Sequence, residues 1–239
     1  MLVTTKAIVL AAIKYGEADL IVSCFTQRDG PKSYLLRNIL KSKKGKVRAS
    51  YFQPLTQLEL VANHKNKGTL ESIREAKVTF PYQTLHTDIV KSSLVMFHSE
   101  VLKATLREEE PNEQLFSFLE RSFKWLDGNT HVGNFHIHFL LKLSNYLGFH
   151  PDTSDIEGQY FNLQEGVFQQ RAYGLYCEEG PEIVALKSFF GIEFDASSQI
   201  KLTKNSRTLL LNLLLRYYQL HAYDFKNPRS LLVLNQLFT

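Results

Sequence analysis

The sequence is poor in cysteine, methionine and tryptophan, with two, two and one of these residues among 239. Cys24 and Cys177 are unaccompanied and far apart, which excludes a disulfide framework and fits a reducing cytosol. Long apolar runs are also missing. Residues 7–13 lack the cleavage site of a signal peptide, and residues 209–215 are too short to span a bilayer. These absences predict a soluble, cytoplasmic protein with no membrane partner.

Catalytic motifs are missing as well. The sequence has no Gly-rich phosphate loop, nucleophile elbow or Cys–His pair, so it predicts no enzyme and no cofactor. His131, His136 and His138 form a loose cluster that invites a metal site. On a helix, however, residues two apart point about 200° away from each other, and no carboxylate has ligand spacing. We therefore favour core or helix-face histidines, and predict no metal.

A core of ordinary size is expected, because hydrophobic residues make up 44% of the chain and charged residues 22%. The charge itself is uneven. Residues 1–80 hold 14 Lys and Arg against 6 Asp and Glu, whereas residues 81–239 hold 14 against 18. The stated net charge of +4 therefore hides a cationic first third, which predicts a polyanionic partner.

The positive charge is densest in what we call the basic segment, residues 32–48, which contains no acidic residue. Its cations are Lys32, Arg37, Lys41, Lys43, Lys44, Lys46 and Arg48. These side chains are candidate phosphate contacts. If about five contacts form, the logarithm of the binding constant falls with log salt at a slope of about −4 to −5. The alternative is a solvated loop that only aids solubility.

Aromatic residues lie in and next to the basic segment. Tyr34 and Tyr51 are candidates to stack on unpaired bases, a contact worth roughly 1–3 kcal/mol per base. The competing interpretation is that strand aromatics fill a core. Alternation places Tyr51 and Phe52 on opposite faces of a strand, so at most one of them faces DNA.

The first eighty residues read as short strands without room for crossover helices. The expected strands cover residues 3–13, 20–26, 32–37, 51–62 and 69–78. Asp29-Gly30 is a strong turn signal between the second and third strands. Five such strands predict a small antiparallel barrel of the OB-fold type, with the Lys-rich part of the basic segment between the third and fourth strands, where OB-folds commonly bind oligonucleotides.

Helical periodicity begins after Pro81. The expected helices lie near residues 89–102, 111–128, 134–146, 182–190, 203–221 and 229–238, with a β-hairpin at residues 160–168. The fold class is therefore α+β. We predict an OB-fold nucleic-acid-binding domain over residues 1–80 and an α-helical domain over residues 81–239.

Several of these pieces resemble, in order, the RecO family of bacterial recombination mediators. The first strand is followed by Tyr-Gly-Glu-Ala-Asp at residues 15–19, and Phe-Gln-Pro-Leu at residues 52–55 precedes a later strand. Near the end, Tyr-Tyr-x-x-His at residues 217–221 is followed by Asn-Pro-Arg-Ser-Leu at residues 227–231. The resemblance covers essentially the whole chain. One departure concerns metal: many members carry a four-cysteine zinc module, but here residues 145–191 offer only Cys177.

The resemblance implies a non-enzymatic protein that binds single- and double-stranded DNA and anneals complementary strands. It further implies that the protein helps RecR to load RecA onto DNA coated by single-strand-binding protein. The acidic C-terminal tail of single-strand-binding protein would then meet cations of the helical half: Arg207, Arg216, Lys226 and Arg229. The alternative for these four is that they are helix-end charges extending from the core.

Two other functions stay open at this point. An OB-fold can also bind structured RNA, which 2′-hydroxyl recognition would reveal as a preference for RNA over DNA. The histidine cluster leaves a metal-dependent hydrolase as the remaining alternative.

Overall fold

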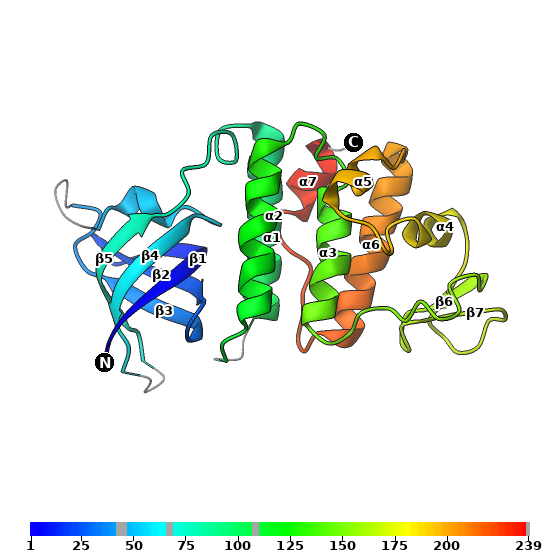
Figure 1. The fold of residues 1–239 in the computed structure, drawn as a ribbon, viewed down its shortest axis with the longest axis horizontal. Helices are drawn as coiled ribbons and strands as arrows, with labels where there is room; N and C mark the ends of the chain where they lie inside the picture. The colour runs from blue at the N-terminus through cyan, green and yellow to red at the C-terminus, as the bar shows by residue number, and fades with distance from the viewer. Residues whose placement is uncertain (42–46, 66–68, 107–109, 238–239) are drawn as a thin grey trace. The chain divides into compact units, whose positions relative to one another are not determined.

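The structure, a computed structural model, describes residues 1–41, 47–65, 69–106 and 110–237. Packing divides the chain into two compact units, Met1–Gly128 and Asn129–Thr239. None of the helices in the described ranges combines the length and apolar character needed to cross a bilayer. The first unit contains a β-barrel followed by two helices, and the second contains shorter helices around two longer ones, with a small sheet (Figure 1).

The barrel is built from five strands that pair in the order β3-β2-β1-β4-β5, and each of these neighbouring pairs is antiparallel. The strands are β1 (Leu2–Tyr15), β2 (Asp19–Thr26), β3 (Gly30–Leu36), β4 (Gln57–Asn63) and β5 (Ser72–Val78). Two backbone hydrogen bonds bring the edge strands together. Leu35 N donates to Glu71 O at 2.9 Å, and Glu71 N donates to Ser33 O at 2.8 Å. This closure gives the predicted OB-like barrel.

Alternation along the strands fills the interior of the barrel. Val22, Cys24, Tyr34 and Leu60 are each fully buried and belong to one apolar cluster. A β-bulge between Val9 and Ala11 interrupts the register of β1 with β2. Beyond the bulge the side chains of β1 exchange faces, so the last part of this strand follows a different inside–outside pattern from the first.

One predicted strand is wrong at its start. Residues 51–56 do not belong to β4, because Ala49–Phe52 forms a 3₁₀-helix (η1) and β4 begins at Gln57. Pro54 explains the break, since proline supplies no N–H to a ladder and restricts the residue before it. Leu55 then adopts a positive φ of 63°. Phe52, only 2% exposed, packs into the barrel core from η1.

Helices α1 (Ile89–Thr105) and α2 (Glu113–Gly128) pack in the same unit as the barrel. Phe25 of β2 faces Phe116 of α2, with ring centroids 6.0 Å apart. Gln57 Nε2 donates to the hydroxyl of Tyr82 at 2.8 Å and to the carbonyl of Glu120 at 2.9 Å. The predicted boundary near residue 80 therefore marks where strands give way to helices, whereas the packing divides the chain after residue 128.

The second unit centres on two long helices, α3 (Phe135–Tyr146) and α6 (Lys204–His221). The hydroxyl of Tyr218 on α6 donates to the carbonyl of Leu140 on α3 at 2.7 Å. Around them lie α4 (Pro181–Lys187), α5 (Phe194–Gln199), α7 (Leu231–Leu237) and a sheet in the order β7-β6-β8. The sheet strands are β6 (Tyr160–Asn162), β7 (Val167–Gln169) and β8 (Cys177–Glu178).

The hairpin predicted at residues 160–168 is thus present, with a short third strand that the sequence pattern did not indicate. Its turn lies against α6, because a Cβ added to Gly166 would lie 2.6 Å from the Tyr217 hydroxyl. That hydroxyl donates to the carbonyl of Phe149 at 2.6 Å. Helix α6 is less uniformly buried than its apolar sequence suggests, since Asn212 and Arg216 lie on an exposed stripe.

Candidate nucleic-acid interface

The start of the basic segment is fixed to the turn between β1 and β2. The N–H of Asn38 donates to Asp19 Oδ1 at 2.7 Å, and the N–H of Leu40 donates to the carbonyl of Ala18 at 2.9 Å. Asn38 adopts a positive φ of 56°, which reverses the chain after β3 and makes these contacts possible. Residues 38–41 are therefore held at the β1–β2 end of the barrel.

Three cations of the basic segment are exposed in the described part of the chain. They are Arg37, Lys41 and Arg48. Lys41 Nζ lies 3.2 Å from Glu17 Oε2, in an ion pair whose side chains are 64% and 90% exposed. A pair this exposed contributes little stability and exchanges readily for a phosphate. Lys43, Lys44 and Lys46 lie outside the described residues.

Two predicted contacts need correction. Lys32 is only 7% exposed and pairs across the ladder with buried Cys24, so it faces the interior and does not present its charge on the surface. Tyr34 is fully buried, and its hydroxyl lies 2.8 Å from His64 Nε2. Alternation along β3 points both side chains inward, which is incompatible with the base stacking predicted for Tyr34.

Tyr34 instead belongs to a buried polar network. His64 Nδ1 lies 3.0 Å from Asp29 Oδ2, so His64 joins the phenol to the carboxylate. Burial raises the pKa of Tyr34 far above its usual value, and the phenol stays neutral. Tyr51, the second predicted stacking residue, is half-buried in η1 and packs against the barrel core.

An exposed aromatic residue that the sequence pattern did not single out lies at the same end of the barrel. Tyr15, the last residue of β1, is 55% exposed, and the neighbouring Lys14 is exposed too. The position of Tyr15 next to the turn at Gly16 could have indicated this exposure, because a side chain at the end of a strand often lies outside the core.

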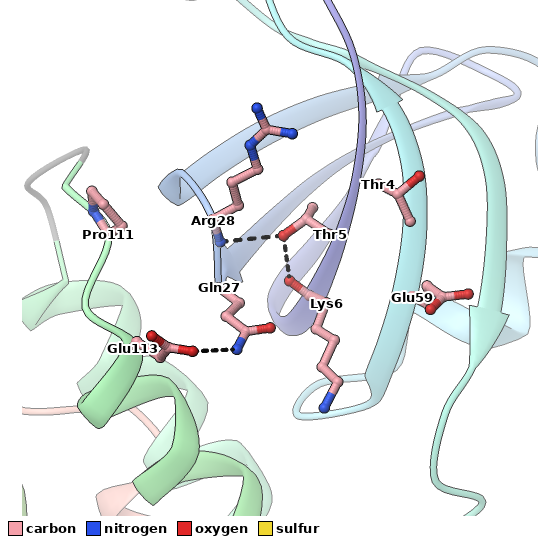
Figure 2. A pocket seen from close by; sticks show the side chains of 8 residues that line it. All are labelled: Thr4, Thr5, Lys6, Gln27, Arg28, Glu59, Pro111 and Glu113. Atoms are coloured by element: carbon pink, nitrogen blue, oxygen red, sulfur yellow. Dashed lines mark hydrogen bonds between the residues drawn. The ribbon is translucent and has the colours of Figure 1, made fainter.

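A pocket of about 630 Å³ opens between the barrel and the start of α2 (Figure 2). It is lined by Thr4, Thr5, Lys6, Gln27, Arg28, Glu59, Pro111 and Glu113. Gln27 Nε2 donates to Glu113 Oε1 at 3.2 Å across it. Because two carboxylates accompany Lys6 and Arg28, the pocket offers no concentrated positive field. It is therefore a poorer polyanion site than the docked basic segment.

The four cations predicted to bind an acidic tail all lie in the second unit. Arg207 is half-buried, and its Nε donates to Asn134 Oδ1 at 3.2 Å. This hydrogen bond links α6 to Asn134, the residue before α3, so Arg207 helps to hold the two helices together. Arg216 is exposed and forms a 2.7 Å ion pair with Glu178, while Lys226 and Arg229 are exposed after α6.

Exposed apolar side chains accompany these cations. Gln219 Nε2 donates to Asn227 Oδ1 at 3.1 Å, so the segment after α6 packs back on the last turns of that helix. Leu220, Tyr223 and Leu232 are 38%, 88% and 75% exposed in this region. Cations beside apolar groups suit a peptide with carboxylates and a hydrophobic end.

Comparison with known proteins assigns the chain to a family. Residues 1–82 match the family model described as "Recombination protein O N terminal", and residues 86–230 match "Recombination protein O C terminal". The chain belongs to the RecO family. Proteins called "DNA repair protein RecO" are 51% identical over 238 residues in Christiangramia forsetii and 45% identical over 240 residues in Flavobacterium psychrophilum. Each alignment covers all of both chains.

Membership in the RecO family gives this protein a general role in recombinational DNA repair. More distant RecO relatives extend over the same length, with 29% identity over 244 residues in Porphyromonas gingivalis. The order of motifs in the sequence had indicated this family, and the match over both halves of the chain confirms that prediction.

This RecO protein holds the region around its second cysteine by hydrogen bonds. The carbonyl of Tyr173 accepts from Asn162 Nδ2 at 3.2 Å, from Gln169 Nε2 at 3.3 Å and from the thiol of Cys177. In the described residues, no group of three or more His, Cys, Asp or Glu side chains is arranged to hold a metal ion. His136 and His138 are buried in α3, whereas His131 is exposed.

Proposed function

We propose that this protein is a non-enzymatic recombination mediator that binds single- and double-stranded DNA and anneals complementary strands. The observation that carries the proposal is the docking of residues 38–41 on the β1–β2 turn, at the end of an OB-like barrel. Exposed Arg37, Lys41 and Arg48 lie in the basic segment, and we include Lys43, Lys44 and Lys46 from the sequence. Such a cluster neutralises phosphates and releases their counterions.

Annealing follows from the same electrostatics. Two complementary strands repel each other through their phosphates, and a cationic surface that binds both lowers this repulsion and raises their local concentration. Neither step requires a bond to be made or broken, which agrees with the lack of catalytic motifs in the sequence.

The second unit supplies the protein partner in this proposal. Arg216, Lys226 and Arg229 would bind the carboxylates of the acidic tail of single-strand-binding protein, while exposed Leu220 and Tyr223 accept its apolar end. The protein would thus reach DNA that single-strand-binding protein already covers, and with RecR it would help RecA to load there. Support for RecR and RecA comes from the family alone.

A strand-annealing assay across a salt series tests the proposal. We expect the protein to speed annealing of complementary oligonucleotides, with and without single-strand-binding protein, and the effect to fade as salt rises. A variant with Lys41, Lys43, Lys44 and Lys46 replaced by Glu should lose most of this activity. A matched control replaces four exposed lysines elsewhere by Glu: Lys77, Lys103, Lys201 and Lys204. An equal loss of annealing activity in both variants would argue against a specific role of the basic segment in binding DNA.

The partner site is tested with the full chain and an acidic peptide ending in Phe. Replacing Arg216 with Ala should weaken binding of this peptide, whereas Arg171→Ala, at another exposed arginine, should not. Undiminished affinity for the peptide after Arg216→Ala would place the binding site of the tail elsewhere.

A separate experiment tests the preference for DNA over RNA. An RNA competitor of equal length should displace bound DNA no better than unlabelled DNA does.

A further inference from the structure

Three strands of the barrel carry an apolar row on their outward face. Ile13 of β1 pairs with Ile21 of β2, and Ile21 pairs with Leu35 of β3, so these three residues form what we call the outer row. Ile13 is 54% exposed, and the other two are half-buried. The open face of an antiparallel sheet is normally polar, so an apolar row there marks a surface that binds something.

The β-bulge in β1 places this row on the outside. Before the bulge Val9 pairs with Cys24 on the interior side, whereas after it Ala11 pairs with Ser23. Ser23 is on the outer face, because its hydroxyl lies 3.3 Å from that of Ser33 and neither side chain is in the core. Ile13 lies two residues beyond Ala11 and shares this face.

Tyr15 continues the same face toward the β1–β2 turn. It lies two residues after Ile13, about 7 Å further along the strand, and is 55% exposed. The face of strands 2 and 3 and the loop between strands 1 and 2 are where OB-folds bind oligonucleotides. An exposed aromatic ring beside an apolar row offers a platform for the flat faces of bases.

Positive charge lies at the same end. Residues 38–41 are docked on the β1–β2 turn, and exposed Arg37 lies two residues after Leu35 of the outer row. Of the two nearby carboxylates, Asp19 accepts the N–H of Asn38, and Glu17 forms only an exposed ion pair with Lys41 that a phosphate can replace. The surface therefore combines an apolar platform with a cationic border, the composition that single-stranded nucleic acid requires.

We propose that Tyr15 and the outer row bind unpaired bases, with Tyr15 stacking on one base while Arg37 and Lys41 contact the adjoining phosphates. This inference rests on the proposed function and deepens it, because it explains how a cationic barrel distinguishes single strands from duplex. In a duplex the base faces are stacked on each other, so this platform adds nothing to duplex affinity. The occupant is single-stranded nucleic acid, not a protein.

The test compares three ligands of the full chain: an oligothymidylate, an abasic oligomer of the same length with phosphates but no bases, and a duplex. Wild type should bind the oligothymidylate roughly 5- to 100-fold more tightly than the abasic oligomer. Tyr15→Ala should lose most of this ratio while its affinity for the abasic oligomer and the duplex stays unchanged. Tyr15→Phe should keep the ratio, and so should Tyr173→Ala, at a tyrosine that is 64% exposed in the second unit.

A second variant reports stacking directly. In Tyr15→Trp the added indole should lose fluorescence on binding the oligothymidylate but not the abasic oligomer, with wild type, whose one tryptophan is Trp125, as the background. If Tyr15→Ala binds all three ligands as wild type does, with a steep salt dependence, the stacking inference is overturned and the proposed function stands. That result is also the one expected if the outer row binds a protein. If wild type binds none of the ligands, the proposed function fails, and this inference fails with it.

Discussion

Asp127 and Thr84 are joined through both backbone and side chain. Asp127 Oδ1 accepts the backbone N–H of Thr84 at 2.8 Å, and the single hydroxyl proton of Thr84 is shared between the Asp127 carbonyl at 2.7 Å and Oδ1 at 3.2 Å. The same carboxylate accepts the N–H groups of Gln83 and Leu85. Lys91 Nζ completes the cluster, donating to the Thr84 hydroxyl and to the Asp127 carbonyl, both at 2.7 Å. The segment after the barrel is thus tied to α1 and α2.

Replacing Asp127 with Ala should lower the free energy of unfolding by about 2–3 kcal/mol, because three backbone N–H groups would lose a charged acceptor in a largely buried place. Burial raises the pKa of the Asp127 carboxyl, but the hydrogen bonds outweigh this, so the pKa lies below its usual value and the group is charged near neutral pH. Urea unfolding measures the change. Asp155→Ala, at an exposed aspartate, is the control and should alter stability by less than about 0.5 kcal/mol. Equal effects of the two changes would contradict the assigned role.

A pair of glycine substitutions tests the contact between the β2–β3 turn and Glu110, three residues before α2. Gly30 and Gly16 both have positive φ, 65° and 60°. A Cβ on Gly30 would lie 2.4 Å from the carbonyl oxygen of Glu110, whereas one on Gly16 would meet nothing within 4 Å. Alanine at either site costs about 1–2 kcal/mol of backbone strain. Gly30→Ala should cost a further ~1–3 kcal/mol from the clash. Urea unfolding should rank the variants in that order, and equal losses would refute the close approach.

Asn38 offers a test of how the basic segment is docked. Its positive φ of 56° suits Asn or Gly but not a β-branched residue. Asn38→Val should therefore destabilise the turn by about 1–2 kcal/mol and weaken DNA binding by displacing Lys41, whereas Asn38→Gly should keep the turn. The test is to measure the affinity of both variants for a DNA duplex, which should be lower for the Val variant. The docking account is contradicted if the Val variant binds as tightly as the Gly variant.

The buried imidazole of His98 should make the stability of the protein depend on pH. It is fully buried in α1, and burial lowers its pKa to about 3, while Nδ1–H donates to the carbonyl of Leu94 at 2.7 Å. The folded state therefore binds fewer protons than the unfolded state, in which histidine has a pKa of about 6.5. Stability should fall as pH drops below about 6.5 and continue to fall toward the folded pKa. In the His98→Leu variant, the melting temperature should change less with pH between about pH 6.5 and 4 than it does in the wild type. His131→Gln, at an exposed histidine, should leave the curve unchanged; an identical curve for His98→Leu would reject the prediction.

The sequence was sufficient for the barrel, the long helices and the family, because alternation, turn signals and helical periodicity are local. It was insufficient for Tyr34 and Lys32, because alternation shows that residues share a face without showing which face is inside. The β-bulge at Val9–Ala11 was likewise invisible, yet it decides that Ile13 and Tyr15 point outward. The packing of α2 on the barrel depends on contacts between distant residues, such as Phe25 with Phe116, that no local pattern encodes.

The most direct test of the account is the salt dependence of duplex DNA binding by wild type and by the variant with Lys41, Lys43, Lys44 and Lys46 replaced by Glu. If about five phosphates are contacted, log K for wild type should fall with log salt at a slope of about −4 to −5, and the variant should flatten that slope by about 3 or more. A correctly folded variant that retains the wild-type slope and affinity would contradict the claim that this segment binds DNA.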